Sequence, residues 1–343
     1  MRLSEIQTPA LILDRKKLVS NIDAMTRHIG SRGIRLRPHL KTCKSIDVAR
    51  LALEDNFGGV TVATLNEAEY FAAHGVRDVL YGVCVTPDKL GRIRTLQESG
   101  VDVTVITDSI EVSQALAGLN ADTCSKLKVM AEIDCGEHRT GVSPDDPVLI
   151  EIASRLHAAD GVEFEGVFTH AGHSYRCRSV AEIERVAEEE RSAAVRAVRA
   201  IQANGIGCRQ VSVGSTPTAL HSRSVEGVTE VRPGVYMFND LFQATLQSCE
   251  IGDIALTVLA TVISHDTRRN RLLIDAGGLA LSKDRSTAGT RHDAGFGRLM
   301  DVDGRGLIGR LCVTDTHQEH GEITSESPIP FQSLPIGSRV RVL

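Results

Sequence analysis

The chain has 343 residues, of which 42% are hydrophobic, 24% charged and 3% aromatic, and its formal net charge is -5 at pH 7. A chain of this length exceeds the size at which one hydrophobic core usually stops growing, so we expect two structural units. Because the charge is mild and basic residues do not gather in runs, nucleic acid and membranes are excluded as partners, and a small molecule is the expected ligand.

The N-terminal residues and the cysteines indicate the compartment. The first residues, MRLSEIQTP, lack the charged and then apolar pattern of a signal peptide, and the eight cysteines are scattered without a CxxC pair. No apolar stretch approaches the roughly 20 residues that a membrane-spanning helix needs. We therefore predict reduced thiols and a cytoplasmic protein.

From residue 15 to about residue 240, short β-branched runs alternate with longer amphipathic stretches, which is typical of successive βα units. The eight predicted strands are Ile34–Leu36, Gly59–Ala63, Val79–Val83, Val103–Ile106, Leu127–Ile133, Phe164–Thr169, Gln210–Val213 and Thr229–Val231. The predicted helices are Lys16–Ile29, Ile46–Leu53, Leu65–His74, Pro87–Glu98, Ile110–Leu119, Pro147–Ala158, Ala181–Asn204 and Pro217–Ser222. Eight such units favour an α/β fold with a (β/α)8 TIM barrel over a doubly wound sheet.

Past Phe238 the pattern changes to strands without long helices. The strand-like segments are Ile254–Ile263, Arg271–Ile274, Arg310–Val313 and Arg339–Leu343, separated by Gly- and Asp-rich turns. The apolar run Ala10–Leu13 has no role in a barrel, so we assign it to the same mainly β domain. We predict a barrel over residues 15–240 and a β domain made of residues 1–14 and 241–343.

Lys41 follows the first predicted strand, in the segment RPHLKTCK. A lysine at the end of a buried strand is a candidate carbonyl-trapping amine, because partial desolvation and a neighbouring cation both lower its pKa. The alternative is that Lys41 and Lys44 are solvated lysines at the start of a helix.

Other polar residues also follow the predicted strands. They are His39 and Lys41 after the first strand, Asp134, His138 and Arg139 after the fifth, His170, His173 and Tyr175 after the sixth, Gly214 to Pro217 after the seventh, and Arg232 to Val235 after the eighth. In a TIM barrel the C-terminal ends of the strands meet at one face, where catalytic residues gather. We therefore expect these residues to lie around one barrel mouth.

The segment Gly214-Ser215-Thr216 indicates a phosphate site, since free N–H groups, two hydroxyls and a helix start coincide there. The alternative is a simple N-cap by Ser215 or Thr216. Gly234 on the next strand lets the backbone approach the same anion and favours the phosphate. Neither GxxxxGK[ST] nor GxGxxG occurs in its proper context.

A lysine that faces a phosphate cradle suits pyridoxal 5'-phosphate (PLP). Arg232 or Glu230 would then meet the pyridine nitrogen, Arg139 the phenolic oxygen and His170 the ring face. For each of these residues taken singly, a salt bridge at the barrel rim or a satisfied histidine is the alternative.

With these residues in place, the sequence resembles the fold-type III PLP enzymes of the D-threonine aldolase and D-serine dehydratase family, which is related to alanine racemase. The motifs that carry the resemblance are TPALILD at 8–14, RPHLKTCKS at 37–45, ATLNEAE at 63–69, DCGEHRTGV at 134–142, THAGHSY at 169–175, VSVGSTPTAL at 211–220, TEVRPGVYMFND at 229–240, IDAGGLALSKDR at 274–285 and QEHG at 318–321. The stretches from the second half of the chain look most like bacterial D-threonine aldolases.

The resemblance implies roles for particular residues. Lys41 would hold the cofactor, and the cofactor-binding set would comprise Lys41, His39, Arg139, His170, Tyr175, Gly214, Ser215, Thr216, Arg232, Gly234 and Val235. Lys41, His170 and His173 would be catalytic, and Glu319 and His320 would line the substrate pocket. Family members pair head to tail, so a homodimer is expected.

The resemblance also implies a divalent metal, Mn, Mg or Zn. Family members continue past a segment like LPIGSRVRVL with Pro-Asn-His and then Cys or Asp, which bind that metal, whereas this chain stops at Leu343. Either the chain is truncated before its metal site or the protein lacks one; we favour truncation and predict no metal ligand within this chain.

The implied reaction is metal-assisted retro-aldol cleavage of D-β-hydroxy-α-amino acids, with D-threonine giving glycine and acetaldehyde. The alternative is dehydration of D-serine or another 3-hydroxy-D-amino acid, which needs the same residues. A racemase comes third, because it requires a second base, usually a tyrosine of the β domain, and no tyrosine lies beyond residue 240. A non-catalytic PLP carrier, which uses a similar barrel alone, comes last. The predicted β domain speaks against it, because a carrier need not cover its barrel mouth.

Overall fold

The structure is a computed structural model that describes residues 2–119, 126–290 and 292–343. It divides into two compact units, one comprising Asn21–Met237 and the other Met1–Ser20 together with Phe238–Leu343. The seven cysteines within the described ranges form no disulfide; the eighth, Cys124, lies outside them. No helix in the described ranges is both long and apolar enough to cross a membrane.

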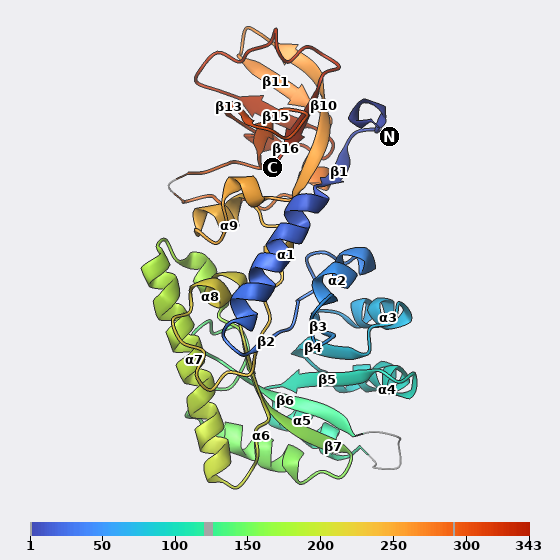
Figure 1. The fold of residues 1–343 in the computed structure, drawn as a ribbon, viewed down its shortest axis with the longest axis vertical. Coiled ribbons are helices and arrows are strands. Elements are labelled where there is room, and N and C mark those ends of the chain that lie inside the picture. Colours follow the sequence, from blue (N-terminus) through green and yellow to red (C-terminus); the bar gives the residue numbers. More distant parts are fainter. Residues whose placement is uncertain (1, 120–125, 291) are drawn as a thin grey trace. The chain divides into compact units, whose positions relative to one another are not determined.

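The first unit contains a parallel sheet of eight strands (Figure 1). The strands are β2 (Arg35–Leu36), β3 (Gly59–Val62), β4 (Asp78–Cys84), β5 (Asp102–Thr107), β6 (Leu127–Ile133), β7 (Val162–Thr169), β8 (Gln210–Val213) and β9 (Glu230–Val231), in the order β2-β9-β8-β7-β6-β5-β4-β3. A parallel bridge between His39 and Thr61 joins the segment after β2 to β3, so the sheet closes. The predicted (β/α)8 barrel is confirmed.

Each barrel strand is followed or preceded by the predicted helix. The helices are α1 (Arg15–Gly30), α2 (Ile46–Leu53), α3 (Leu65–Ala73), α4 (Leu90–Glu98) after the 3-10 turn η2 (Pro87–Lys89), α5 (Ile110–Ala117), α6 (Pro147–His157), α7 (Val180–Ala203) and α8 (Thr216–His221). Hydroxyl and carboxylate side chains begin several of them; the Ser179 side chain, for example, accepts the N–H of Glu182 at the start of α7. Gly205, with a φ of 76°, lets the chain leave α7 in the left-handed conformation.

Apolar residues of the central strands fill the barrel interior. Leu80, Ile106, Met130 and Phe168, from β4 to β7, form one buried cluster. Strands covered on both sides read as continuous apolar runs, which is why the sequence pattern marked them. Each such side chain contributes about 1.5–3 kcal/mol through burial, and together these strands make the rigid frame of the mouth.

The second unit is an antiparallel sheet of eight strands. They are β1 (Ala10–Leu13), β10 (Leu256–Asp266), β11 (Arg271–Ile274), β12 (Arg298–Met300), β13 (Leu307–Cys312), β14 (Asp315–Thr316), β15 (Gly321–Thr324) and β16 (Arg339–Val342). The order is β13-β12-β16-β10-β11-β15-β14, and β1 pairs with β10. The N-terminal strand therefore belongs to the β unit, as predicted.

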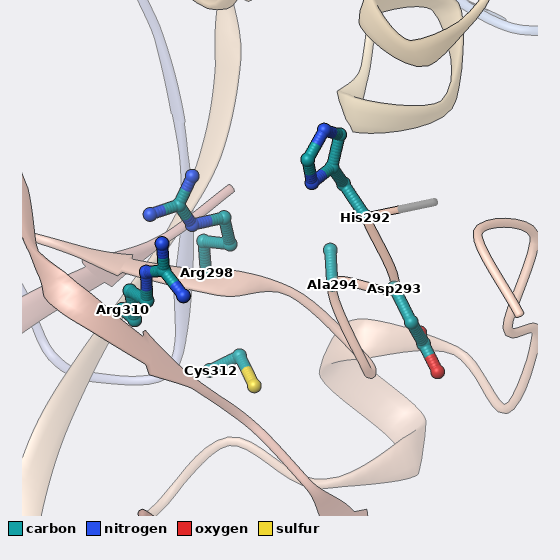
Figure 2. A pocket seen from close by; sticks show the side chains of 6 residues that line it. All are labelled: His292, Asp293, Ala294, Arg298, Arg310 and Cys312. Carbon is teal, nitrogen blue, oxygen red and sulfur yellow. The ribbon is translucent and has the colours of Figure 1, made fainter. Parts of the chain in front are cut away.

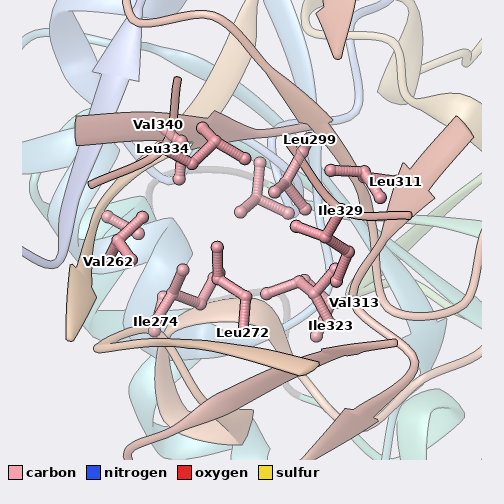
Figure 3. Close-up of a cluster of buried hydrophobic side chains, with 13 residues drawn as sticks. Val262, Leu272, Ile274, Leu299, Leu311, Val313, Ile323, Ile329, Leu334 and Val340 are labelled. Atoms are coloured by element: carbon pink, nitrogen blue, oxygen red, sulfur yellow. The ribbon is translucent and has the colours of Figure 1, made fainter. Parts of the chain in front are cut away.

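Short helical pieces and one compact core complete the β unit. The pieces are η1 (Leu3–Glu5), α9 (Leu241–Thr245), η5 (Ile251–Asp253) and α10 (Gly278–Leu281). Thirteen buried residues form the core shown in Figure 3, among them Leu272 and Ile274 of β11, Leu299 of β12 and Val340 of β16. Leu272 and Ile274 of β11 and Leu299 of β12 are fully buried, so strands that are separated in the sequence share this core.

Candidate active site

Lys41 lies in the turn that follows β2, at the C-terminal side of the barrel. Partial desolvation lowers the pKa of its ammonium from 10.5, and the Arg139 guanidinium adds to this effect. The carboxylates of Glu137 and Glu67 act in the opposite direction, and Arg232 again lowers the pKa. The side chain itself is exposed, so the amine is accessible to a carbonyl compound and is more readily unprotonated than an ordinary lysine.

His39 and His170 flank this lysine as neutral rings. The N–H of Lys41 donates to Nδ1 of His39 (3.4 Å), and Nδ1 of His170 donates to the carbonyl of Gly214 (2.8 Å). Burial is the main cause that lowers the pKa of His39 well below 6.5 and that of His170 to about 3. Because Nδ1 of His170 bonds to a carbonyl, its proton is on Nδ1, and Nε2 is an acceptor.

Arg232 is the buried cation of the site, with 4% of its surface exposed. Its guanidinium donates to Oγ of Ser212 (2.5 Å) and to the carbonyl of Thr169, and lies 3.6 Å above the ring of Phe168. Burial lowers its pKa to about 10, so it stays charged at neutral pH. Because a buried charge is costly unless it is paired, the Arg232 guanidinium needs a hydrogen-bond acceptor or an anion nearby.

Glu230 was the other candidate for the pyridine nitrogen, and the structure shows it fully engaged. Its carboxylate accepts hydrogen bonds from Nε of Arg37 (3.0 Å) and from Oγ of Ser212 (2.5 Å). Arg37 also binds Asp78 (2.6 Å). Arg232 is therefore the better candidate of the two, and Glu230 supports it through Ser212.

The predicted phosphate cradle joins two loops. Gly214 has a φ of 123°, and a Cβ there would lie 3.0 Å from the N of Arg232. A Cβ on Gly234 would lie 2.5 Å from the carbonyl oxygen of His39, so glycine is needed at both positions. Val235, the last predicted member, begins the 3-10 helix η4 (Val235–Met237).

The two hydroxyls of the cradle differ. Ser215 caps α8, because its Oγ accepts the N–H of Thr218 (3.3 Å), as the simpler alternative required. The hydroxyl of Thr216 is buried and has no hydrogen-bond partner among the described residues. Buried polar atoms are normally paired, so this hydroxyl is a ready donor for an anion.

Arg139 and His173 lie on either side of a carboxylate that the sequence analysis did not select. Arg139 is exposed and 3.8 Å from Glu137, which also accepts the N–H of Gly172 (3.2 Å). Burial lowers the pKa of His173, opposed mainly by Glu137. Arg139 thus contributes to the electrostatics of Lys41, whereas His173, in the loop after β7, interacts with Glu137. Tyr175 is in the same 3-10 helix as His173, η3 (Gly172–Arg176).

A second cluster holds the Arg139 segment. The thiol of Cys84 donates to Glu132 (2.8 Å) and Asp108 (3.3 Å), while Glu132 accepts the hydroxyl of Thr140 (2.8 Å) and Asp108 the N–H of Gly141 (2.8 Å). Among the described residues this is the one group of three with metal-ligating atoms close together. Burial raises the pKa of both the thiol and Glu132, so a metal ion bound here would have to displace their protons.

Glu190 of α7 links the two loops of the site from beneath. Its Oε1 accepts the N–H of Ala171 (2.9 Å), next to His170, and the N–H of Gly214 (2.9 Å). The residue is 2% exposed, and burial raises its pKa. One carboxylate oxygen therefore fixes the spacing between the loop after β7 and the loop after β8.

The sequence pattern held a signal for Glu190 that was not used. Ile183, Val186, Ala193 and Ala197 are buried on one face of α7, and Glu190 falls on the same face. A carboxylate inside an apolar stripe at helical spacing indicates a buried partner.

The remaining predicted residues, Glu319 and His320, lie in the β unit. They form the exposed turn between β14 and β15, where the N–H of His317 donates to the carbonyl of His320 (2.8 Å). Their role in a substrate pocket stays a prediction.

Comparison with known proteins agrees with this architecture. Residues 13–241 match the family model of the alanine racemase N-terminal domain, and residues 255–343 match that of a putative serine dehydratase domain. The chain is similar to D-threo-3-hydroxyaspartate dehydratase of Delftia sp. strain HT23, with 41% identity over 99% of this chain and 90% of the relative. A solved structure of that enzyme has a TM-score of 0.95, with 40% identity over 99% of this chain and 91% of that one.

Two further relatives have other activities. D-serine dehydratase of Dictyostelium discoideum is 31% identical over 99% of this chain and 90% of the relative. 3-Hydroxy-D-aspartate aldolase of Paracoccus denitrificans strain Pd 1222 is 32% identical over 82% of this chain and 74% of the relative. The chain therefore belongs to the alanine racemase-like fold-type III family of PLP enzymes, in the branch with a serine dehydratase domain.

Proposed function

We propose that this chain is a PLP-dependent lyase that acts on D-β-hydroxy-α-amino acids, and that its reaction is dehydration to a 2-oxo acid and ammonia. The observation that carries the proposal is the arrangement of Lys41, the neutral His170 and the charged Arg232 around one barrel mouth. Family membership supports the cofactor and the D-amino-acid substrate class.

The residues present fit PLP. Lys41 would hold the aldehyde carbon, and the buried, unpartnered hydroxyl of Thr216 would donate to the phosphate between Gly214 and Gly234. Arg232 would face the ring nitrogen, and His170 the ring itself. When bound, the cofactor supplies an aldehyde for the substrate amine and a ring that withdraws electrons from Cα.

The protein groups then have separate tasks. The lowered pKa of Lys41 leaves its Nζ able to take up the proton of Cα at a pH where an ordinary lysine is blocked. His170 cannot compete for that proton, because its pKa is about 3 and its Nδ1 proton is held by Gly214. Arg232 places a fixed positive charge where electron density accumulates.

A comparison of two relatives favours dehydration over retro-aldol cleavage, the reaction that the sequence motifs alone favoured. The Delftia dehydratase matches nearly the whole chain at 41% identity, whereas the Paracoccus aldolase matches 82% of it at 32%. Retro-aldol cleavage is the second candidate, since it uses the same residues except for a base on the β-hydroxyl. Glu137 and His173, which lie together after β6 and β7, are the described groups available for such a base.

The resemblance also implies a divalent metal. Among the described residues, Cys84, Asp108 and Glu132 are the one group of three with ligating atoms close together, and in this structure these atoms are engaged in hydrogen bonds with one another and with the Arg139 segment.

Product identification tests the proposal. The purified chain is loaded with PLP and incubated with D-threo-3-hydroxyaspartate, D-serine and D-threonine, with the L-enantiomers as controls, and 2-oxo acids, ammonia, glycine and aldehydes are measured. We expect equal amounts of 2-oxo acid and ammonia from the D-substrates, and none with Lys41→Ala. Glycine and an aldehyde as the only products would establish the second candidate instead. A chain that holds PLP yet makes neither product would overturn both.

A further inference from the structure

A pocket of about 600 Å3 lies in the β unit, on the side of β12 and β13 (Figure 2). His292, Asp293, Ala294, Arg298, Arg310 and Cys312 line it. None of these residues belongs to the candidate active site, and all of them lie in the unit that contains Phe238–Leu343.

Two arginines share one face of the sheet in this pocket. Arg298 of β12 pairs directly with Cys312 of β13. Arg310 is two residues before Cys312, so its side chain leaves β13 on the same face. Arg298 and Arg310 are diagonal neighbours across this antiparallel pair, so their like charges repel one another, and an interaction with an anion would compensate this repulsion.

The described residues provide little such compensation. Arg298 donates one N–H to the carbonyl of Gly309 (2.9 Å), which leaves most of its donors unused. Arg310 is exposed and has no hydrogen bond or salt bridge to any residue of the described ranges. Figure 2 shows both guanidinium groups on one side of the pocket, with the imidazole of His292 across from them.

Asp293, the acid that lines this pocket, is directed elsewhere. Its carboxylate binds the guanidinium of Arg285 and accepts the hydroxyl of Thr287 (3.2 Å) and the N–H of Gly295 (2.9 Å). In Figure 2 it points away from the two arginines. The pocket therefore keeps a net positive lining.

An apolar depression continues from the same place. A second pocket of about 430 Å3 shares His292, Ala294 and Arg298 with the first. It adds Leu241, Ala244 and Ile251, with Glu250 among its remaining lining residues. A ligand that fits both would carry its anionic group at the arginines and a short carbon skeleton toward α9.

We infer that Arg298 and Arg310 form a binding site for a small oxyanion, either a carboxylate of a short dicarboxylic acid or a phosphate group. A planar guanidinium presents two parallel N–H donors that match either group, and such charge-assisted pairs are the strong ones among hydrogen bonds. His292 adds a third donor from the opposite wall. The site is independent of the proposed lyase activity.

Isothermal titration calorimetry of the PLP-loaded chain tests this inference, with succinate and inorganic phosphate as separate probes. Loading with PLP keeps the probes out of the Gly214–Thr216 cradle, and the visible absorbance of the cofactor shows that it is not displaced. We expect saturable binding of at least one probe, weakening at higher ionic strength. The stronger probe identifies the ligand as carboxylate or phosphate.

Substitutions show whether the measured heat of binding comes from this pocket. Arg310→Ser should weaken binding at least tenfold, and Arg310→Lys, which keeps the charge but not the paired donors, should weaken it less. The matched control is Arg305→Ser, which removes another exposed arginine of the same unit outside the pocket. Arg310 is exposed, so its replacement should leave thermal unfolding unchanged. Absence of binding for both probes, or equal loss in the Arg310 and Arg305 variants, would overturn the inference.

Discussion

The charge around Lys41 is balanced by two residues of one loop. Arg139 lowers the pKa of the amine and Glu137 raises it, and the two side chains lie 3.8 Å apart. The loop that carries them is tied to Glu132 and Asp108 through Thr140 and Gly141. The reactivity of the amine is therefore adjusted by a segment that never needs to touch the lysine.

This balance predicts opposite effects of two substitutions. Only the unprotonated amine of Lys41 reacts, so the rate at which the apoprotein captures PLP should rise with pH. The midpoint of this pH–rate curve should lie below 10.5. Arg139→Gln should move that midpoint upward and Glu137→Gln downward, as measured by stopped-flow absorbance. If neither variant moves the midpoint, desolvation alone lowers the pKa of the Lys41 amine.

The half-buried His170 predicts how stability depends on pH. Its folded pKa of about 3 lies below the ordinary value of 6.5, so between these values the unfolded chain binds a proton that the folded chain does not. The free energy of unfolding of the apoprotein should therefore fall as the pH drops from 6.5 toward 3, and this contribution is fully present above 6.5.

Urea unfolding at a series of pH values measures this effect. His170→Asn should flatten the fall, because the variant lacks the titrating ring. His157→Asn, at an exposed position of α6, is the control and should keep the original slope. Equal slopes in both variants would contradict a neutral, half-buried His170.

At the residue scale, the sequence predicted the groups that follow strands and missed the groups that support them. Lys41, His170 and Arg232 were selected because the barrel rule assigns chemistry to strand ends, and the structure places them there, while their roles stay predictions. Glu190 and Glu132 lie inside a helix and a strand, where the rule for strand ends does not apply. Only the register of α7 and β6 shows that these carboxylates face inward.

Among the elements, α7 does more than cover the barrel. Through Glu190 it holds the backbone of Ala171 and of Gly214 at one oxygen atom. A shift of this helix would therefore move the His170 loop and the phosphate cradle together.

Substitution of Glu190 separates this role from simple packing. Glu190→Ala leaves two buried N–H groups unpaired, at about 1–3 kcal/mol each, and should weaken PLP affinity. Glu190→Gln keeps a carbonyl oxygen for both N–H groups and should retain most stability and affinity. Urea unfolding and a PLP titration measure the two effects, with exposed Glu189→Ala as control. If Glu190→Ala binds PLP as tightly as Glu189→Ala, the carboxylate has no positioning role.

The pairing of β7 with β8 depends on a glycine. Gly166 is opposite Gln210 and has a φ of 143°, and a Cβ there would lie 2.0 Å from the carbonyl oxygen of Gln210. Backbone strain of this kind costs about 1–3 kcal/mol, and the clash adds to it.

Gly166→Ala should therefore lower the urea midpoint of unfolding clearly. Gly207→Ala is the control, because a Cβ there meets nothing within 4 Å. Similar midpoints for the two variants would mean that β7 and β8 separate without cost.

At the element scale, the barrel was predictable because most of its strands are apolar runs that alternate with periodic helices. Boundaries such as Leu127–Ile133 and Ile46–Leu53 agree with the structure. The short strands β12, β14 and β15 were not predicted, since runs of two to four residues carry too little periodicity. These short strands form because they pair with strands that are distant in the sequence.

On the scale of the whole molecule, the β unit exposes several large apolar side chains. Leu11 is 68% exposed, Leu279 71% and Ile336 63%. We propose that the chain forms a homodimer, as the resemblance implied, with this unit contributing to the contact. Sedimentation equilibrium should give twice the chain mass of 37.0 kDa. A single species of 37.0 kDa at every concentration would contradict the dimer.

The barrel closes at the segment that carries Lys41. Its seam is one bridge, between His39 and Thr61, supported by hydrogen bonds from Leu40 to Thr61 (2.9 Å) and from Thr61 to Pro38 (2.9 Å). Segments held by few backbone hydrogen bonds open first and exchange their amide protons earliest. The strand order β2-β9-β8 places Lys41 and the loop after β8 on the same side of this seam, so a molecule bound to both leaves the seam itself to these backbone hydrogen bonds. Opening of this seam would therefore move Lys41 and the loop after β8 away from β3 together.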